Sequence, residues 1–286
     1  MYFIKKFLTP FLLLGLLVAK FAKYLFMIFK FGKLGSLASM LVSVWAYSWL
    51  FGWPFAVGFV LLILVHELGH ALVLKREGIG AGLPVFIPFM GAVISMRGLP
   101  RNAWIEAKVA FGGPLLGTLG SLCVLGMGLY SQEPLFFALA KTGFLINLFN
   151  MMPVSPMDGG RILGAVSKWF LIIGLGIGAA LNIFYLKSPL LYMMLLLGCL
   201  QAWRTFKDPV PGYYEIPTVQ RLTTGLAYLA LLASLFWALA FTKPFLQDLT
   251  PHDDLVFSSG VILFFALSKL FARSLTEDKL CIESPL

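Results

Sequence analysis

The chain has 286 residues, of which 59% are hydrophobic and 12% are charged, and its formal net charge is +9. Soluble domains carry about 25% charged residues, so this composition, with repeated apolar runs of about twenty residues, excludes an ordinary soluble domain and predicts a multi-span membrane protein. In a soluble protein the positive charge would suggest a nucleic-acid partner. Here lysine and arginine on cytoplasmic loops explain it better, so we expect no nucleic acid.

The apolar runs predict an all-α polytopic membrane protein with about eight or nine transmembrane helices. Residues 1–33 are apolar and basic, and they predict either a first span or a helix lying in the interface. Eight further spans are predicted at 34–51, 54–74, 103–130, 134–152, 161–185, 189–203, 222–241 and 255–273. We divide the chain into an N-terminal segment, a core and a C-terminal loop with two further helices, at 1–33, 34–203 and 204–286.

The cationic side chains are distributed unequally between the two sides of this topology. One side holds Lys75, Arg76, Arg97, Arg101, Lys108, Arg161, Arg204, Lys207, Arg221, Arg273 and Lys279. The loops on the other side hold only Lys187 and Lys243. Because cytoplasmic loops are enriched in lysine and arginine, the first side is predicted to be cytoplasmic. We expect a multi-pass protein of the cell membrane.

Between the second and third of these eight spans lies a segment that is too interrupted to form a helix. Residues 79–97 read IGAGLPVFIPFMGAVISMR, with β-branched and aromatic side chains around glycine and proline. This pattern predicts a short β-hairpin or re-entrant loop near the candidate functional residues of the span at 54–74. The alternative is a simple connector on the cytoplasmic face.

Three ionisable side chains interrupt the apolar run LLILVHELGHALVLKREG at 61–78. His66 and His70 are four residues apart, so on a helix they lie on one face, close enough to bind one metal ion, and Glu67 borders the same place. In this spacing two imidazoles bind zinc and the carboxylate serves as general base. The alternative is a polar pair that bonds neighbouring helices.

A catalytic zinc ion takes three protein ligands and leaves one position open. His252 lies in a predicted external loop, so the third ligand should be Glu77, Glu106 or Asp158 on the cytoplasmic side. Asp158 stands in LINLFNMMPVSPMDGGRIL, residues 145–163, where two prolines break the helix. Its carboxylate is either aimed at the histidines or simply caps the next helix.

The two stretches together resemble the site-2 protease family of intramembrane zinc metalloproteases. HELGH at 66–70 matches the family's HExxH, and NMMPVSPMDGG at 150–160 matches its N-x-x-P-x-x-P-x-D-G motif. The similarity covers roughly residues 54–165, the family's catalytic core. It implies that His66, His70 and Asp158 bind one Zn²⁺ per chain. It also implies that Glu67 is the catalytic residue.

Asn150 matches the asparagine of the second motif and is a candidate substrate-binding residue. Its amide is able to bind the substrate backbone or the oxyanion, and the alternative is a polar clamp between helices. The chain departs from the pattern at Gly117, where many relatives carry an asparagine after the Gly-Pro pair. The PDZ or CBS domains of many relatives have no counterpart in this sequence, so the resemblance is to a compact form.

The resemblance implies a zinc metalloendopeptidase that hydrolyses peptide bonds within or near transmembrane segments, as in regulated intramembrane proteolysis. Its partners would be a transmembrane protein substrate and the lipid bilayer, with the active site toward the cytoplasm. Two other classes are a proteolytically inactive scaffold that binds membrane helices and a metal-ion transporter. A transporter needs ionisable groups through the membrane depth, and Lys141 is the other charge deep in a predicted span. The sequence does not determine the oligomeric state.

Overall fold

The computed structural model describes residues 32–246. Its α-helices are α2 (Gly32–Phe51), α3 (Trp53–Arg76), α4 (Ala103–Ser131), α5 (Pro134–Asn150), α6 (Asp158–Val166), α7 (Phe170–Leu181), α8 (Pro189–Lys207) and α9 (Thr218–Thr242). A π-helical turn (Asn182–Leu186) continues α7, and a 3-10 turn (Pro244–Leu246) follows α9. Two short strands, β1 (Val85–Ile87) and β2 (Gly91–Val93), complete the described part. The predicted helical class is therefore confirmed.

Within residues 32–246, four helices are long and apolar enough to cross a membrane. They are Lys33–Phe51, Trp53–Arg76, Ala103–Ser131 and Thr218–Thr242. Pro134–Asn150 and Phe170–Tyr185 are apolar but shorter. A chain with several spans is thus supported, whereas a total of eight or nine is not confirmed. Most of the N-terminal segment and the predicted span at 255–273 lie outside the described residues.

The prediction of one continuous span at 161–185 is wrong, because two helices occupy this stretch. α6 begins at Asp158 and ends before Ser167, whose backbone is extended (φ −158°, ψ 134°). The Ser167 hydroxyl accepts a hydrogen bond from the Trp169 amide at 3.4 Å, which replaces the helical pattern locally. The chain then turns and continues as α7 from Phe170.

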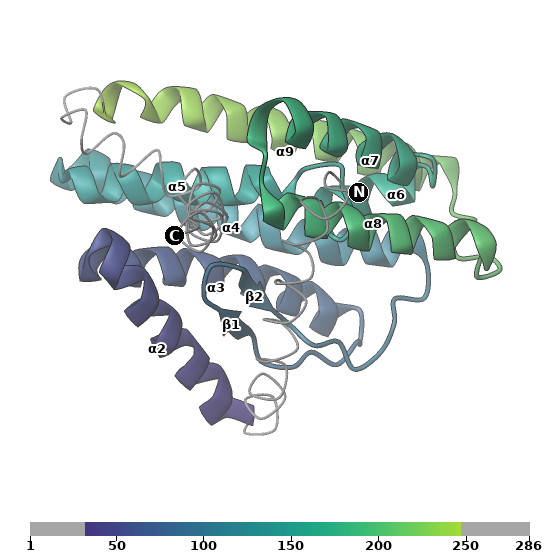
Figure 1. The fold of residues 1–286 in the computed structure, drawn as a ribbon, viewed down its shortest axis with the longest axis horizontal. Helices are drawn as coiled ribbons and strands as arrows, with labels where there is room; N and C mark the ends of the chain where they lie inside the picture. The colour runs from purple at the N-terminus through teal and green to yellow at the C-terminus, as the bar shows by residue number, and fades with distance from the viewer. Residues whose placement is uncertain (1–31, 247–286) are drawn as a thin grey trace, which may run out of the picture.

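The helices α3, α4, α5 and α9 run side by side across Figure 1, and α6, α7 and α8 gather toward one end. A buried apolar cluster joins the first four of them with α6, and it includes Leu62, Ala110, Phe144, Ile162 and Leu235. This cluster forms the core beside which the ionisable side chains of α3 lie.

Helices α3 and α4 approach each other closely within the HELGH sequence, at Gly69. A Cβ atom built at Gly69 would lie 2.0 Å from the carbonyl oxygen of Gly112, so the two backbones are in direct contact. Small residues allow helices in membranes to approach in this way. The contact fixes the α3 histidines against the start of the Gly-Gly-Pro segment of α4.

The segment at 79–97 contains an antiparallel hairpin, as predicted. Val85 pairs with Val93 and Ile87 with Gly91. The hairpin packs on α2, where the Ser39 hydroxyl accepts a hydrogen bond from the Phe86 amide at 3.1 Å. β1 therefore faces α2, and β2 also contacts α3 (Figure 1).

Candidate metal centre

Helix α3 carries His66, Glu67 and His70 in its second half. At about 1.5 Å per residue, the two histidines lie about 9 to 15 Å from the Lys75–Arg76 end of the helix. The side chains of His66 and His70 are only 5% and 12% exposed. Glu67 is 8% exposed and lies within electrostatic range of His66 and Asp158. The helical spacing places these polar groups in a protected interior position.

Asp158 reaches the two histidines from the first turn of α6. Its Oδ2 atom lies 3.2 Å from His66 Nε2 and 3.3 Å from His70 Nε2. The two Nε2 atoms are 3.1 Å apart. Met157 is the N-cap residue of α6, so the carboxylate is not the helix cap that the alternative interpretation required. The turn at 151–157, between α5 and α6, places Asp158 beside the α3 histidines.

The other ring nitrogen of each histidine has a hydrogen-bond partner. His70 Nδ1 lies 2.7 Å from the carbonyl oxygen of Val109, and His66 Nδ1 lies 2.8 Å from Asn147 Oδ1. A carbonyl oxygen only accepts, so each Nδ1 carries a hydrogen and donates. Each Nε2 atom then presents a lone pair toward Asp158.

This donor set fits a metal ion. Two imidazole nitrogens and one carboxylate oxygen converge with lone pairs, an arrangement that is repulsive without a shared cation or proton. Ligand atoms about 2.0–2.1 Å from a tetrahedral zinc ion lie about 3.3–3.4 Å apart. The three separations of 3.1, 3.2 and 3.3 Å are close to this value. Among the described residues, these three side chains form a group with metal-ligand chemistry.

Helix α4 makes room for the two Nε2 atoms at Gly113. A Cβ atom at this position would lie 2.2 Å from His70 Nε2 and 2.7 Å from His66 Nε2. Any side chain here would occupy space at the convergence point of the donor atoms. Because Gly113 has no side chain, the space where the donor atoms converge stays open, and Gly113 therefore belongs to the site.

The other candidate carboxylates have different partners. Glu77 pairs with Lys108 Nζ at 2.5 Å. Glu106 Oε1 pairs with Arg161 Nε at 3.2 Å, and its Oε2 accepts a hydrogen bond from the Tyr213 hydroxyl at 2.5 Å. Of the three carboxylates that the sequence offers as third ligand, Asp158 is the one placed at the histidines. His252 lies outside the described residues.

A chain of polar contacts connects the centre to the loop between α8 and α9. Arg161 Nη1 lies 3.9 Å from Asp158 Oδ1, and the same guanidinium bonds Glu106, which in turn accepts from Tyr213. Burial, followed by the neighbouring Glu106 carboxylate, raises the pKa of Tyr213 far above its ordinary value, so its hydroxyl stays a donor. Through Arg161, this loop therefore supports the Oδ1 side of the Asp158 carboxylate, whereas Oδ2 lies at the histidines.

Asn150, the predicted substrate-binding residue, lies at the end of α5. Its amide nitrogen donates to the carbonyl oxygen of Ile146 at 3.1 Å, one turn earlier in the same helix. The asparagine that contacts a histidine is Asn147, which the sequence reasoning missed. A second asparagine one turn from Asn150 in an apolar helix was the available signal, because an amide in such a helix needs a partner.

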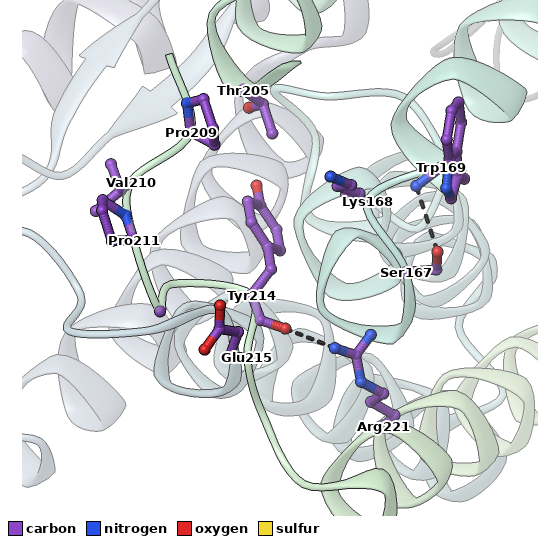
Figure 2. A pocket seen from close by; sticks show the side chains of 11 residues that line it. Ser167, Lys168, Trp169, Thr205, Pro209, Val210, Pro211, Tyr214, Glu215 and Arg221 are labelled. Carbon is purple, nitrogen blue, oxygen red and sulfur yellow. Dashed lines mark hydrogen bonds between the residues drawn. The ribbon is translucent and has the colours of Figure 1, made fainter. Parts of the chain in front are cut away.

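A separate cavity of about 470 Å³ lies beside the loop between α8 and α9 (Figure 2). It is lined by Ser167, Lys168, Trp169, Thr205, Pro209, Val210, Pro211, Gly212, Tyr214, Glu215 and Arg221. Arg221 donates to the backbone carbonyls of Val166, Tyr214 and Ile216, so its guanidinium ties the loop to α6. The residues that line this cavity do not include the histidines or Asp158.

The described residues thus combine apolar helices long enough to cross a membrane with an H-E-x-x-H sequence whose two histidines lie beside a carboxylate from another helix. Residues 54–134 match the model of peptidase family M50. This match confirms the resemblance to the site-2 protease family and, with the apolar helices, supports an integral membrane protein.

Several curated proteins are similar to this chain. The zinc metalloprotease MJ0392 of Methanocaldococcus jannaschii is 31% identical over 156 residues, which are 50% of this chain and 45% of the relative. The putative zinc metalloprotease Rip3 of Mycobacterium tuberculosis is 33% identical over 143 residues, 46% of this chain and 36% of the relative. The probable chloroplastic zinc metalloprotease EGY1 of Arabidopsis thaliana is 24% identical over 237 residues, 64% and 42% respectively. The matched regions cover less than half the length of each relative.

Proposed function

We propose that the protein is an intramembrane zinc metalloprotease that hydrolyses peptide bonds within or near transmembrane segments of membrane protein substrates. The observation that carries this proposal is the convergence of His66 Nε2, His70 Nε2 and Asp158 Oδ2 within 3.3 Å inside a helical core. The M50 match and the names of the relatives support a metalloprotease over a scaffold or a transporter.

His66, His70 and Asp158 would hold one Zn²⁺ per chain. Two nitrogens and one oxygen with one position left open are typical of catalytic zinc sites. Zinc bound there would supply Lewis-acid polarisation of the scissile carbonyl and a lowered pKa for the attacking water.

Glu67 is the proposed general base. Its carboxylate follows His66 directly in the helix and is buried within electrostatic range of His66 and Asp158. It takes a proton from the attacking water while the oxygen adds to the peptide carbonyl, and it then gives that proton to the departing amine. Its burial keeps competing bulk water away from this transfer.

Asn150 is the proposed substrate-binding residue. It stands at the end of α5, immediately before the turn that leads to Asp158. One amide hydrogen bonds Ile146, which leaves the second hydrogen and the oxygen for substrate backbone. Asn150→Leu should reduce cleavage strongly while zinc is retained. Unchanged cleavage would refute the substrate-binding role and favour the alternative that Asn150 is a polar clamp between helices.

The substrate must expose its backbone to be cleaved. A transmembrane helix hides its amides in its own hydrogen bonds, so substrates are expected to carry glycine, proline or asparagine within the span. The unwound strand would pair with the edge of β2, since β1 already faces α2. Proline substitutions at 91–93 should therefore reduce cleavage, and intact cleavage would refute this pairing.

We further propose eight or nine spans, a core at 34–203 and residence in the cell membrane with the site toward the cytoplasm. The Ala103 amide donates to the Tyr213 carbonyl oxygen at 2.9 Å, so the start of α4 and the loop between α8 and α9 lie at one end of the molecule. Cationic side chains gather in these segments. Leu99, shortly before α4, and Tyr130, in the last turn of α4, are 86% and 94% exposed and provide labelling sites at opposite ends of this helix.

In a cysteine-free background, Leu99→Cys should resist a membrane-impermeant maleimide in intact cells, whereas Tyr130→Cys should react. The reverse labelling pattern would overturn the orientation.

The decisive experiment measures zinc per chain by elemental analysis in detergent, followed by cleavage of a membrane-embedded reporter. Wild type should hold about one zinc, Asp158→Ala should lose most of it, and Glu67→Gln should keep it without cleaving. Folded wild type that binds no added zinc would refute the protease assignment. It would favour the scaffold class.

A further inference from the structure

The amide of Asn147 lies between α3 and α5 in a fixed orientation. The residue is 2% exposed, its Nδ2 donates to the Gly143 carbonyl oxygen at 2.8 Å, and its Oδ1 lies 2.8 Å from His66 Nδ1. A backbone carbonyl only accepts hydrogen bonds, so the group that faces Gly143 is the amide nitrogen. The oxygen must then face His66.

This orientation determines which nitrogen of His66 carries the hydrogen. An amide oxygen only accepts, so His66 Nδ1 must be the donor. The Nε2 atom is then left with its lone pair, 3.2 Å from Asp158 Oδ2. If the amide were absent, either ring nitrogen could carry the hydrogen and the ring could rotate.

Gly117 on α4 provides the space for this amide. A Cβ atom at Gly117 would lie 2.3 Å from Asn147 Oδ1 and 2.8 Å from Asn147 Nδ2. Even the smallest side chain would therefore push against the atom that accepts from His66. The Gly117 carbonyl oxygen accepts from Ser121 Oγ at 2.8 Å, whereas the Asn147 amide donates to Gly143 in its own helix.

We propose that Asn147 is a positioning residue that sets the tautomer and ring orientation of His66 for metal binding, in a slot kept open by Gly117. The proposal rests on the zinc site proposed above. Partners of this kind behind a metal-binding histidine typically change metal affinity by about 10- to 100-fold when they are removed.

The test measures Zn²⁺ affinity by competition with a chromophoric chelator and records the Co²⁺ absorption bands of the purified full chain in detergent. Asn147→Leu should weaken Zn²⁺ binding by about 10- to 100-fold and alter the Co²⁺ spectrum. Asn147→Asp keeps an acceptor oxygen and should stay closer to wild type. If Asn147 contributed only packing, Asn147→Leu and Asn147→Asp would not differ in this way in Zn²⁺ affinity or Co²⁺ spectrum.

Gly117→Ala tests the slot without removing Asn147. It should weaken Zn²⁺ binding in the wild-type background but have no further effect in Asn147→Ala, because the shortened side chain leaves room for the methyl group. Two controls are matched to these changes. Asn150→Leu removes an α5 amide that bonds Ile146, and Gly126→Ala adds a methyl group to α4 where nothing lies within 4 Å.

Wild-type affinity and an unchanged Co²⁺ spectrum in Asn147→Leu would overturn the proposal. If Gly117→Ala weakens Zn²⁺ binding equally in the wild-type and Asn147→Ala backgrounds, the proposed slot is refuted. If Asn147→Leu does not fold, Asn147→Ala takes its place in the comparison with Asn147→Asp, and Gly117→Ala still tests the slot. Failure of wild type to bind metal would instead refute the proposed function, so the two outcomes are distinguishable.

Discussion

The replacement of Gly113 by alanine would disturb the proposed metal centre without removing any ligand. The new methyl carbon would lie 2.2 Å from His70 Nε2 and 2.7 Å from His66 Nε2, whereas ordinary contact begins at 3.4 Å. The two nitrogens must therefore retreat by about 1.2 and 0.7 Å, or α4 must move away from α3 by a similar amount. Metal–ligand distances tolerate only about 0.2 Å. We expect zinc affinity to fall at least about 100-fold.

Zinc content and chelator competition measure this loss directly, and thermal unfolding of the metal-free protein in detergent shows whether the helices still assemble. Alanine has a higher helix propensity than glycine by about 1 kcal/mol, so α4 itself should not be weakened. Gly126→Ala is the matched control, because it adds the same methyl group to the same helix where nothing lies within 4 Å. Folded Gly113→Ala protein with one zinc at wild-type affinity would refute the proposed convergence of donor atoms.

Three further predictions concern packing, pH and metal removal. Gly69→Ala should reduce stability by about 1–3 kcal/mol, because the new carbon would lie 2.0 Å from the fixed backbone oxygen of Gly112. An unchanged midpoint of thermal unfolding would contradict that contact. Burial and the Glu106 carboxylate raise the pKa of Tyr213 above its ordinary value of 10, so above about pH 10 the unfolded chain loses this proton first and stability falls as pH rises. Tyr213→Phe should make this alkaline decline shallower in melting curves, and an identical decline would show that Tyr213 is not its source. Removal of zinc by a chelator should lower the unfolding midpoint, since a ligand at about 100 times its Kd stabilises by about 2.7 kcal/mol. Asp158→Ala should lack this shift, and a shift of equal size in that variant would place the stabilising zinc elsewhere.

The local pattern of the sequence was sufficient for the part of the site that lies within one helix. Four residues separate His66 from His70, and the 3.6-residue period alone places them on one face. The prolines before Asp158 predict the end of α5 and the turn that follows, and the β-branched residues at 85–93 predict the hairpin. These features depend on neighbouring residues along the chain, which the sequence lists directly.

The contacts between helices were not predictable in the same way. The motif drew attention to Asn150, but the sequence does not show that Asn147 bonds His66 whereas Asn150 bonds its own helix. The break at Ser167 was missed because the run from 161 to 185 is apolar on both sides of it. The partners of Glu77 and Glu106 also became clear only from the structure.

The physical reason lies in the composition of the spans. A helix in a soluble protein has a polar face and an apolar face, and this difference indicates which side packs inward. The spans of this chain are apolar around most of their circumference, because lipid and protein interior are similar solvents for them. The sequence by itself thus determined most of the helices, the spacing of the paired histidines and the position of Glu67, the proposed general base. The motif at 150–160 already pointed to Asp158 as the third ligand, but only the tertiary structure decided which faces meet, at Gly69, Gly113 and Gly117, and therefore which amide lies behind His66.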